Sequence, residues 1–309
     1  MKTLDKELRT NNRLTTGLSV FIVILYMIFA FNACEAQELQ VGILTGTSNY
    51  YGDLSESSGS FIQKYTPVNK TTTVSKGFFI RNQISDKWAY RINITYGKLV
   101  GDDRLSNSEE HKMRNLHFRS YILEYAFLPE FTFFKKGFIV NNKLHGLSIY
   151  GGIGGGVFFF EPLAEYQGYW YELQTLGTEG QGNYDPTTES LKIDHYSLIQ
   201  LSIPVITGLK YDLTDRIRIG FEIGFRKTFT DYIDDVSTVY TDPEDLRYAY
   251  GDVAVSLANR SIEIDSNSSD TVHKTGMARG DDSAQDSYMF TCFSVSYVLP
   301  GNSRLKYRR

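Results

Sequence analysis

The sequence lacks both a disulfide framework and an excess of charge. It holds 2 cysteines among 309 residues, and beyond the first 36 residues only Cys292 is left. An exported chain with one cysteine forms no internal disulfide, so we expect Cys292 to be a small buried side chain in a strand. A formal net charge of −4 offers no basic surface to nucleic acid. We therefore expect no nucleic-acid partner.

The chain also lacks a helix-length apolar run outside its N-terminus. Residues 18–31 are continuously apolar, follow a basic segment and precede a stretch with small residues that ends at Ala36. This order predicts a signal peptide over residues 1–36. An uncleaved anchor helix and lipidation at Cys34 are the alternatives. Because no later run of about eighteen apolar residues follows, a mature chain in a membrane can cross it only as a β-barrel.

Aromatic residues, by contrast, are abundant, with 22 Tyr and 20 Phe. They favour strands and the aromatic girdles at membrane interfaces. Residues 217–226 alternate strictly, with Ile and Phe on one face and Arg, Gly and Glu on the other. A period of two is typical of a strand between two different environments. The same period predicts eight strands, over residues 39–48, 78–84, 88–98, 120–128, 147–160, 196–211, 216–226 and 287–299.

The expected connections are alternately long and short. Residues 85–87, 135–146 and 212–215 form the short or moderate ones. The long loops include residues 161–195, which are rich in aromatic residues and glycine, and residues 230–286, which are polar. An even strand count with this asymmetry predicts an all-β, eight-stranded antiparallel up-and-down transmembrane barrel over residues 37–300. It would lie in the outer membrane of a Gram-negative bacterium, with long extracellular loops, short periplasmic turns and both termini periplasmic. A soluble eight-stranded barrel, with the apolar faces inside, is the alternative.

The polar strand faces carry full charges, which a barrel of this size would bury in its lumen. Buried charges need partners, so an ion-pair network that fills the lumen is the main interpretation, and an ion pathway is the alternative. The fifth strand adds a row of glycines on one face, which we expect to make room for large lumen side chains. The predicted lumen residues are Arg81, Arg91, Glu124, Lys210, Arg218, Glu222 and Arg226.

No pattern in the chain predicts a catalytic, cofactor-binding or metal-binding site, and we expect no enzyme activity. Four aspartates between residues 231 and 242 lack EF-hand spacing. A solvated loop is the expectation for them, and ion binding there stays open. Residues 301–309 form a basic tail, which we expect on the periplasmic side and free to contact an acidic partner surface through Arg304, Lys306, Arg308 and Arg309.

An ordered set of segments resembles the PorG family. The set comprises GILTGTSNYYGDL at 42–54, ITYGKLVGDD at 94–103, YELQTLGTEGQG at 171–182, QLSIPVITGLK at 200–210, GFRKTFTDYIDDVSTVY at 224–240, LANRS at 257–261 and YMFT at 288–291. Together they extend over nearly the whole predicted mature chain.

The resemblance implies an outer-membrane barrel of the type IX secretion system, the machine that exports folded proteins across the outer membrane. It also implies association with a periplasmic ring of PorK- and PorN-type proteins, and it supplies no catalytic residue. A stand-alone OmpA-like or adhesin-like barrel, whose long loops bind outside partners, is the alternative function.

Overall fold

The computed structural model describes residues 38–54, 70–140, 143–182, 184–185, 190–191, 194–265 and 273–300. The predicted signal peptide and the basic tail, with Arg304, Lys306, Arg308 and Arg309, lie outside the described residues. No helix in these ranges is long and apolar enough to cross a membrane.

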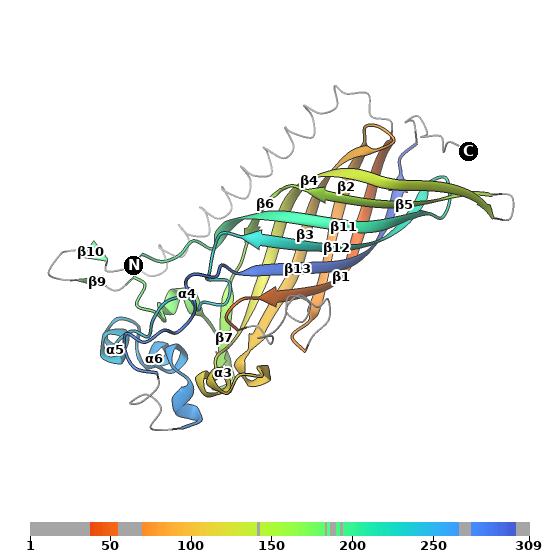
Figure 1. The fold of residues 1–309 in the computed structure, drawn as a ribbon. Coiled ribbons are helices and arrows are strands. Elements are labelled where there is room, and N and C mark those ends of the chain that lie inside the picture. Colours follow the sequence, from red (N-terminus) through yellow and green to blue (C-terminus); the bar gives the residue numbers. More distant parts are fainter. Residues whose placement is uncertain are drawn as a thin grey trace.

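Eight strands close into one barrel, which confirms the predicted fold class (Figure 1). Each strand pairs antiparallel with its sequence neighbours, and β13 pairs with β1 to complete the ring. The strands are β1 Glu38–Tyr51, β2 Thr73–Gln83, β3 Trp88–Asp102, β4 His117–Val140, β5 Lys143–Ile153 continued by β6 Gly155–Phe159, β11 Ile199–Asp212, β12 Ile217–Thr228 and β13 Ser287–Val298.

The break between β5 and β6 falls at Gly154, where both neighbouring strands carry a proline. Pro129 of β4 and Pro204 of β11 have no N–H to donate across the sheet. The Gly154 N–H still donates to the Pro204 carbonyl oxygen, at 3.0 Å. A Cβ atom at Gly154 would lie 1.9 Å from the carbonyl oxygen of Phe127 on β4. The expectation that this glycine row makes room for large lumen side chains is therefore wrong here: at Gly154 the space is taken by neighbouring backbone.

Apolar side chains face outward from the barrel and charged ones face inward. Leu201 and Phe293 on the outer surface are 59% and 64% exposed, whereas Arg91 and Glu124 on the inner surface are 1% and 0% exposed. On β12 the alternation runs as predicted, with Ile219 outward and Glu222 inward. This polarity is the reverse of a soluble barrel and matches strands that face lipid. The soluble alternative is thus wrong.

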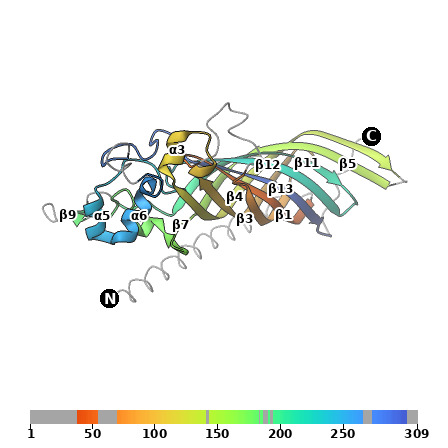
Figure 2. The ribbon, with the colours of Figure 1, turned by 90° about the horizontal axis from the view of Figure 1, so that it is seen from below.

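The described parts of the long connections lie at one end of the barrel, and the tight turns, the start of β1 and the end of β13 lie at the other (Figures 1 and 2). We call the described residues of the long connections, 52–54, 70–72, 103–116, 160–182, 184–185, 190–191, 194–198, 229–265 and 273–286, the cap. Its elements are η2 Asp103–Leu105, α3 Glu109–Arg114, β7 Pro162–Tyr166, β8 Tyr169–Glu172, α4 Leu173–Leu176, α5 Pro243–Tyr250, α6 Asp252–Ala258 and η3 Ser261–Glu263. A further short pair, β9 Tyr184–Asp185 and β10 Ser190–Leu191, lies within the same connection as β7 and β8.

Two predictions about connections are wrong. Residues 161–195 and 230–286 are not simply loops, because the cap elements in their described parts fold over a shared core that includes Leu173, Val236 and Leu257. Residues 135–146 do not form a loop either. The described residues of this segment, 135–140 and 143–146, belong to β4 and β5, which pair as far as Val140 and Lys143 and extend beyond the other strands as a two-stranded ribbon (Figure 2).

Candidate functional site

Glu130 is the centre of the largest ion cluster in the lumen. Its carboxylate accepts hydrogen bonds from Arg81 Nε at 2.9 Å and from Lys210 Nζ at 2.8 Å, and Arg91 lies 3.1 Å away. Arg91 also pairs with Glu222 at 2.7 Å, and Glu222 accepts a hydrogen bond from the Tyr150 hydroxyl at 2.6 Å. This cluster therefore connects side chains from β2, β3, β4, β5, β11 and β12 across the barrel interior.

Two smaller clusters lie toward the ends of the barrel. Near the cap, Arg226 pairs with Glu124 at 3.1 Å, and the Tyr288 hydroxyl donates to the same carboxylate at 2.7 Å. At the opposite end, near the start of β1, Arg218 pairs with Glu38 and with Asp212. The side chains in both clusters are buried or nearly so.

The charges in these clusters balance. Five cations pair with five anions among the described residues, and every one of the ten side chains has at least one ionic partner. Arginine side chains also stack on aromatic rings, as Arg226 does over Phe290 at 4.6 Å. A lumen lined by paired charges can stiffen the barrel, and a barrel of eight strands has an interior just wide enough for side chains to fill.

The structure brings together all seven of the predicted lumen residues. It adds three anions that the sequence prediction missed: Glu38, Glu130 and Asp212. Each lies at or just beyond the end of a predicted strand. Glu130 has the same strand parity as Glu124, so extending the predicted strand past Pro129 would have found it.

The cap contains a second buried network, centred on Glu179. Its carboxylate accepts hydrogen bonds from the backbone N–H groups of Ser237 and Thr238, at 2.9 and 3.0 Å, and from Arg279 Nη1 at 3.0 Å. Arg279 also donates to the Asp235 carbonyl oxygen. One buried acid therefore holds the connection after β6 against the connection after β12.

Asp235 extends this network on its other side. Its carboxylate accepts hydrogen bonds from the hydroxyls of Thr178, at 2.5 Å, and Tyr196, at 2.6 Å. Burial raises the pKa of Asp235 to about 6, although the nearby Arg279 opposes this. Sequence reasoning expected solvated aspartates in this segment, and that expectation is wrong for Asp235, which is 0% exposed.

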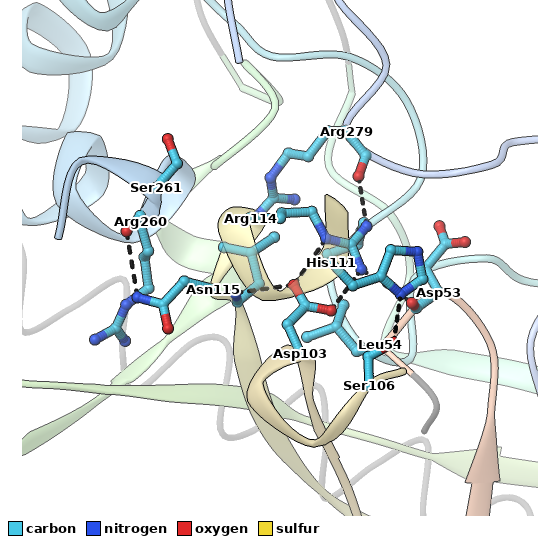
Figure 3. A network of polar contacts seen from close by, with 12 residues as sticks. Asp53, Leu54, Asp103, Ser106, His111, Arg114, Asn115, Arg260, Ser261 and Arg279 are labelled. Atoms are coloured by element: carbon cyan, nitrogen blue, oxygen red, sulfur yellow. Dashed lines mark hydrogen bonds and ion pairs between the residues drawn. The ribbon is translucent and has the colours of Figure 1, made fainter. Parts of the chain in front are cut away.

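Arg114 of α3 connects three of the four long connections (Figure 3). Its Nε and Nη2 atoms donate to Asp103 at 2.8 Å. The same guanidinium donates to the carbonyl oxygens of Asp53, at 2.9 Å, and Arg279, at 2.7 Å. With five donors in a rigid fork, arginine suits such a junction.

A third feature of the cap is a group of aspartates around the Tyr50 hydroxyl. This oxygen lies 2.6 Å from Asp234 Oδ2 and 2.5 Å from Asp286 Oδ1. Since a hydroxyl has one proton, it can donate to only one of them, and the second contact needs a proton on the other carboxyl group. Burial raises the pKa of both aspartates. Nearby, burial raises the pKa of Asp231 to about 8.

These cap contacts join four of the seven segments quoted in the sequence analysis: 42–54, 171–182, 224–240 and 257–261. Glu179 of segment 171–182 holds segment 224–240, and Arg279 donates to the Ala258 carbonyl oxygen in segment 257–261 at 3.1 Å. Tyr50 of segment 42–54 reaches Asp234. Among the described residues, no three His, Cys, Asp and Glu side chains are grouped so as to hold a metal ion.

A family model described as a domain of unknown function, DUF6089, matches residues 19–167 and 183–255. The chain belongs to the DUF6089 family. No curated protein matches this DUF6089 chain.

Three solved structures illustrate what the barrel of this DUF6089 chain is similar to. Ail of Yersinia pestis, the N-terminal barrel of Pseudomonas aeruginosa OprF and the Neisserial surface protein NspA are 10%, 7% and 8% identical to it. The matches cover 85%, 85% and 84% of this chain and 98%, 98% and 96% of those chains, with TM-scores of 0.35, 0.32 and 0.33. The assignment as an outer-membrane-type barrel follows from this chain's own strand pairing and surface polarity.

Proposed function

We propose that this chain is an outer-membrane barrel component of the type IX protein secretion machinery that associates with a periplasmic ring of PorK- and PorN-type proteins. One observation carries the proposal. Four of the seven segments that resemble the PorG family, 42–54, 171–182, 224–240 and 257–261, are far apart in sequence but contribute to the buried cap contacts of Glu179, Arg279 and Tyr50. A resemblance that falls on one structural unit is stronger support than the same segments scattered over the surface.

The role within the machine is that of a structural component. A lumen with paired charges and no excess charge supports anchoring rather than passage of cargo through this barrel. The folded cap and the projecting ribbon at the opposite end provide rigid surfaces on both sides of the membrane.

Co-purification from the envelope tests the proposal. The chain, carrying an affinity tag in an exposed position of the cap, is extracted in mild detergent, and every co-purifying protein is identified. We expect PorK- and PorN-type ring proteins in the eluate and outer-membrane markers in the same fraction. A barrel recovered without ring proteins, from cells that contain the ring, would overturn the proposal.

The basic tail offers a first location for the contact. Deleting residues 302–309 should weaken ring association, and the loss should be largest at low salt, if Arg304, Lys306, Arg308 and Arg309 meet an acidic surface. Heat-modifiable migration of the barrel on gels serves as the control for assembly. Unchanged association would exclude the tail and leave other segments at the same end of the barrel.

A further inference from the structure

The ribbon formed by β4 and β5 has a free edge. The strand β3 begins at Trp88, opposite Phe131. The last backbone hydrogen bond on the β3 side of β4 runs from the Thr132 N–H to the Lys87 carbonyl oxygen, at 2.8 Å. Beyond that point β4 pairs only with β5, as far as Val140. Eight residues of β4 therefore extend roughly 25 Å without a strand on their other side among the described residues.

The base of the ribbon marks the membrane boundary. The rings of Trp88, Phe131 and Phe133 pack edge to face, with centroids 4.9 and 5.4 Å apart. Such an aromatic row on the outer surface is typical of the girdle where a barrel leaves the lipid. The ribbon beyond it lies in water, since unpaired backbone groups are not tolerated in hydrocarbon.

The ribbon is ordered by contacts within it and with its neighbours. On one face Phe138 stacks on His145 and packs at a tilt against Tyr211 of β11, with centroids 6.1 and 6.0 Å apart. At the base, Lys135 pairs with Asp86 at 3.5 Å. On the other face Ile139 is 64% exposed. A pre-ordered strand with a free edge and an exposed apolar side chain is what strand addition by a partner requires.

Natural sheets often protect free edges with bulges and lysines. Both are present near the base, where Phe133 is the bulged residue and Lys135 and Lys136 follow. Neither protects the outer half, from Gly137 to Val140, where the exposed Ile139 lies. Protection therefore limits pairing to the outer half of the edge.

Charge selects the kind of partner. Between residues 131 and 160 the sequence has three lysines and no Asp or Glu. A second copy of the ribbon would bring lysine against lysine, which is unfavourable across paired strands. An extended segment with acidic side chains would instead be attracted and kept in register.

We propose that the free edge of β4 from Gly137 to Val140 accepts a β-strand with acidic side chains from a partner protein. The added strand pairs through its backbone and covers Ile139 with an apolar residue. Identifying that partner as a ring protein rests on the proposed function. The inference that this edge accepts a strand does not depend on it.

The test combines a shortened ribbon, a charge change and a crosslink. Because Gly137 and Gly146 are paired, replacing residues 138–145 with Asn-Gly closes the hairpin early. Lys136→Glu is a surface change that keeps the ribbon. A photo-crosslinking amino acid at Ile139 is compared with one at Ile203, which faces lipid.

We expect the shortened ribbon to lose most of the co-purified partner while the barrel stays heat-modifiable. Lys136→Glu should weaken the association, and the crosslink at position 139, but not at 203, should map to an extended acidic segment. Normal association of both variants, or crosslinks only to lipid or to a second copy, overturns the inference. If ring proteins bind both ribbon variants normally, only this inference fails. If they do not bind the wild-type chain, the proposed function fails. In that case the segment crosslinked at position 139 still tests whether the ribbon edge binds an acidic strand.

Discussion

The lumen and the cap both bury charged side chains, but they neutralise them in different ways. In the lumen each anion has a nearby cation, as Glu130 has in Arg81, Arg91 and Lys210. In the cap, Arg279 compensates Glu179, whereas the aspartates around Tyr50 have mainly hydroxyl and backbone donors. The carboxylates of the lumen are therefore neutralised by cations. In this part of the cap they are neutralised by protonation and by hydrogen bonds.

The comparison has a physical origin. Lumen residues come from neighbouring strands of one closed sheet, where opposite charges can face each other at every second position. Cap residues come from separate connections, where no strand register places an opposite charge beside each acid. Several acids therefore lie close together where these connections meet. We expect the barrel to resist changes of pH and the cap to respond to them. Four predictions test this contrast, from the largest expected effect to the smallest.

Glu130→Ala should be the most damaging change, because it leaves Arg81, Arg91 and Lys210 without their shared anion. Removing one partner of a buried ion pair costs about 3–5 kcal/mol. Denaturant titration of the barrel, followed by heat-modifiable migration, measures the loss. Glu244→Ala, at a carboxylate that is 80% exposed, is the matched control. Equal stability of the two variants would show that the lumen does not depend on its ion pairs.

Phe221→Arg should cost about 2–4 kcal/mol if residue 221 lies near the middle of the bilayer. The Phe221 ring packs on Phe293 of β13, at 5.1 Å between centroids, on the outer surface of the barrel. Folding into lipid vesicles measures the effect. Tyr248→Arg, at a cap side chain that is 96% exposed, should fold normally. Normal folding of the Phe221 variant would place its face away from lipid.

Gly52→Ala should loosen the cap and spare the barrel. A Cβ atom there would lie 1.9 Å from both Asp286 Oδ1 and the Tyr50 hydroxyl, which are held in place by their hydrogen bonds. Overpacking of this kind costs about 1–3 kcal/mol. Gly155→Ala has nothing within 4 Å and is the control. Limited proteolysis should cut the cap of the Gly52 variant faster than the cap of the Gly155 variant. Equal rates would show that the Tyr50 contacts rearrange without loss of stability.

The smallest effect concerns pH. The pKa of Asp231 rises to about 8 because of burial, and neighbouring acids add to it. The folded cap then holds a proton that the unfolded chain releases above about pH 4. Stability of the cap should therefore fall as the pH rises from about 4 to about 8, and change little beyond.

Hydrogen exchange of the cap and the barrel in detergent, over this range of pH, measures that dependence. Asp231→Asn removes the titrating group and should reduce the slope in the cap. An identical slope in the variant would exclude Asp231 as its source. The barrel strands, compared in the same samples, should show less change with pH.

Much of the barrel could be predicted from the sequence, because a strand with different environments on its two faces must alternate. That rule is sufficient to place Arg91, Glu124 and Arg226 on inward faces. It missed Glu38, Glu130 and Asp212 because the predicted strands were too short, not because the rule failed. The predicted fourth strand stopped at residue 128, yet β4 continues past Pro129 for eleven residues, to Val140.

The sequence by itself determined the eight strands, their inward and outward faces and the end of the barrel from which the long connections leave. Tertiary structure alone decided the cap, the ribbon and the pairing of each charge. Glu179 and Thr238, or Tyr50 and Asp286, meet across long separations in the chain. Contacts between distant irregular segments follow no period, whereas a strand repeats its two environments at every second residue.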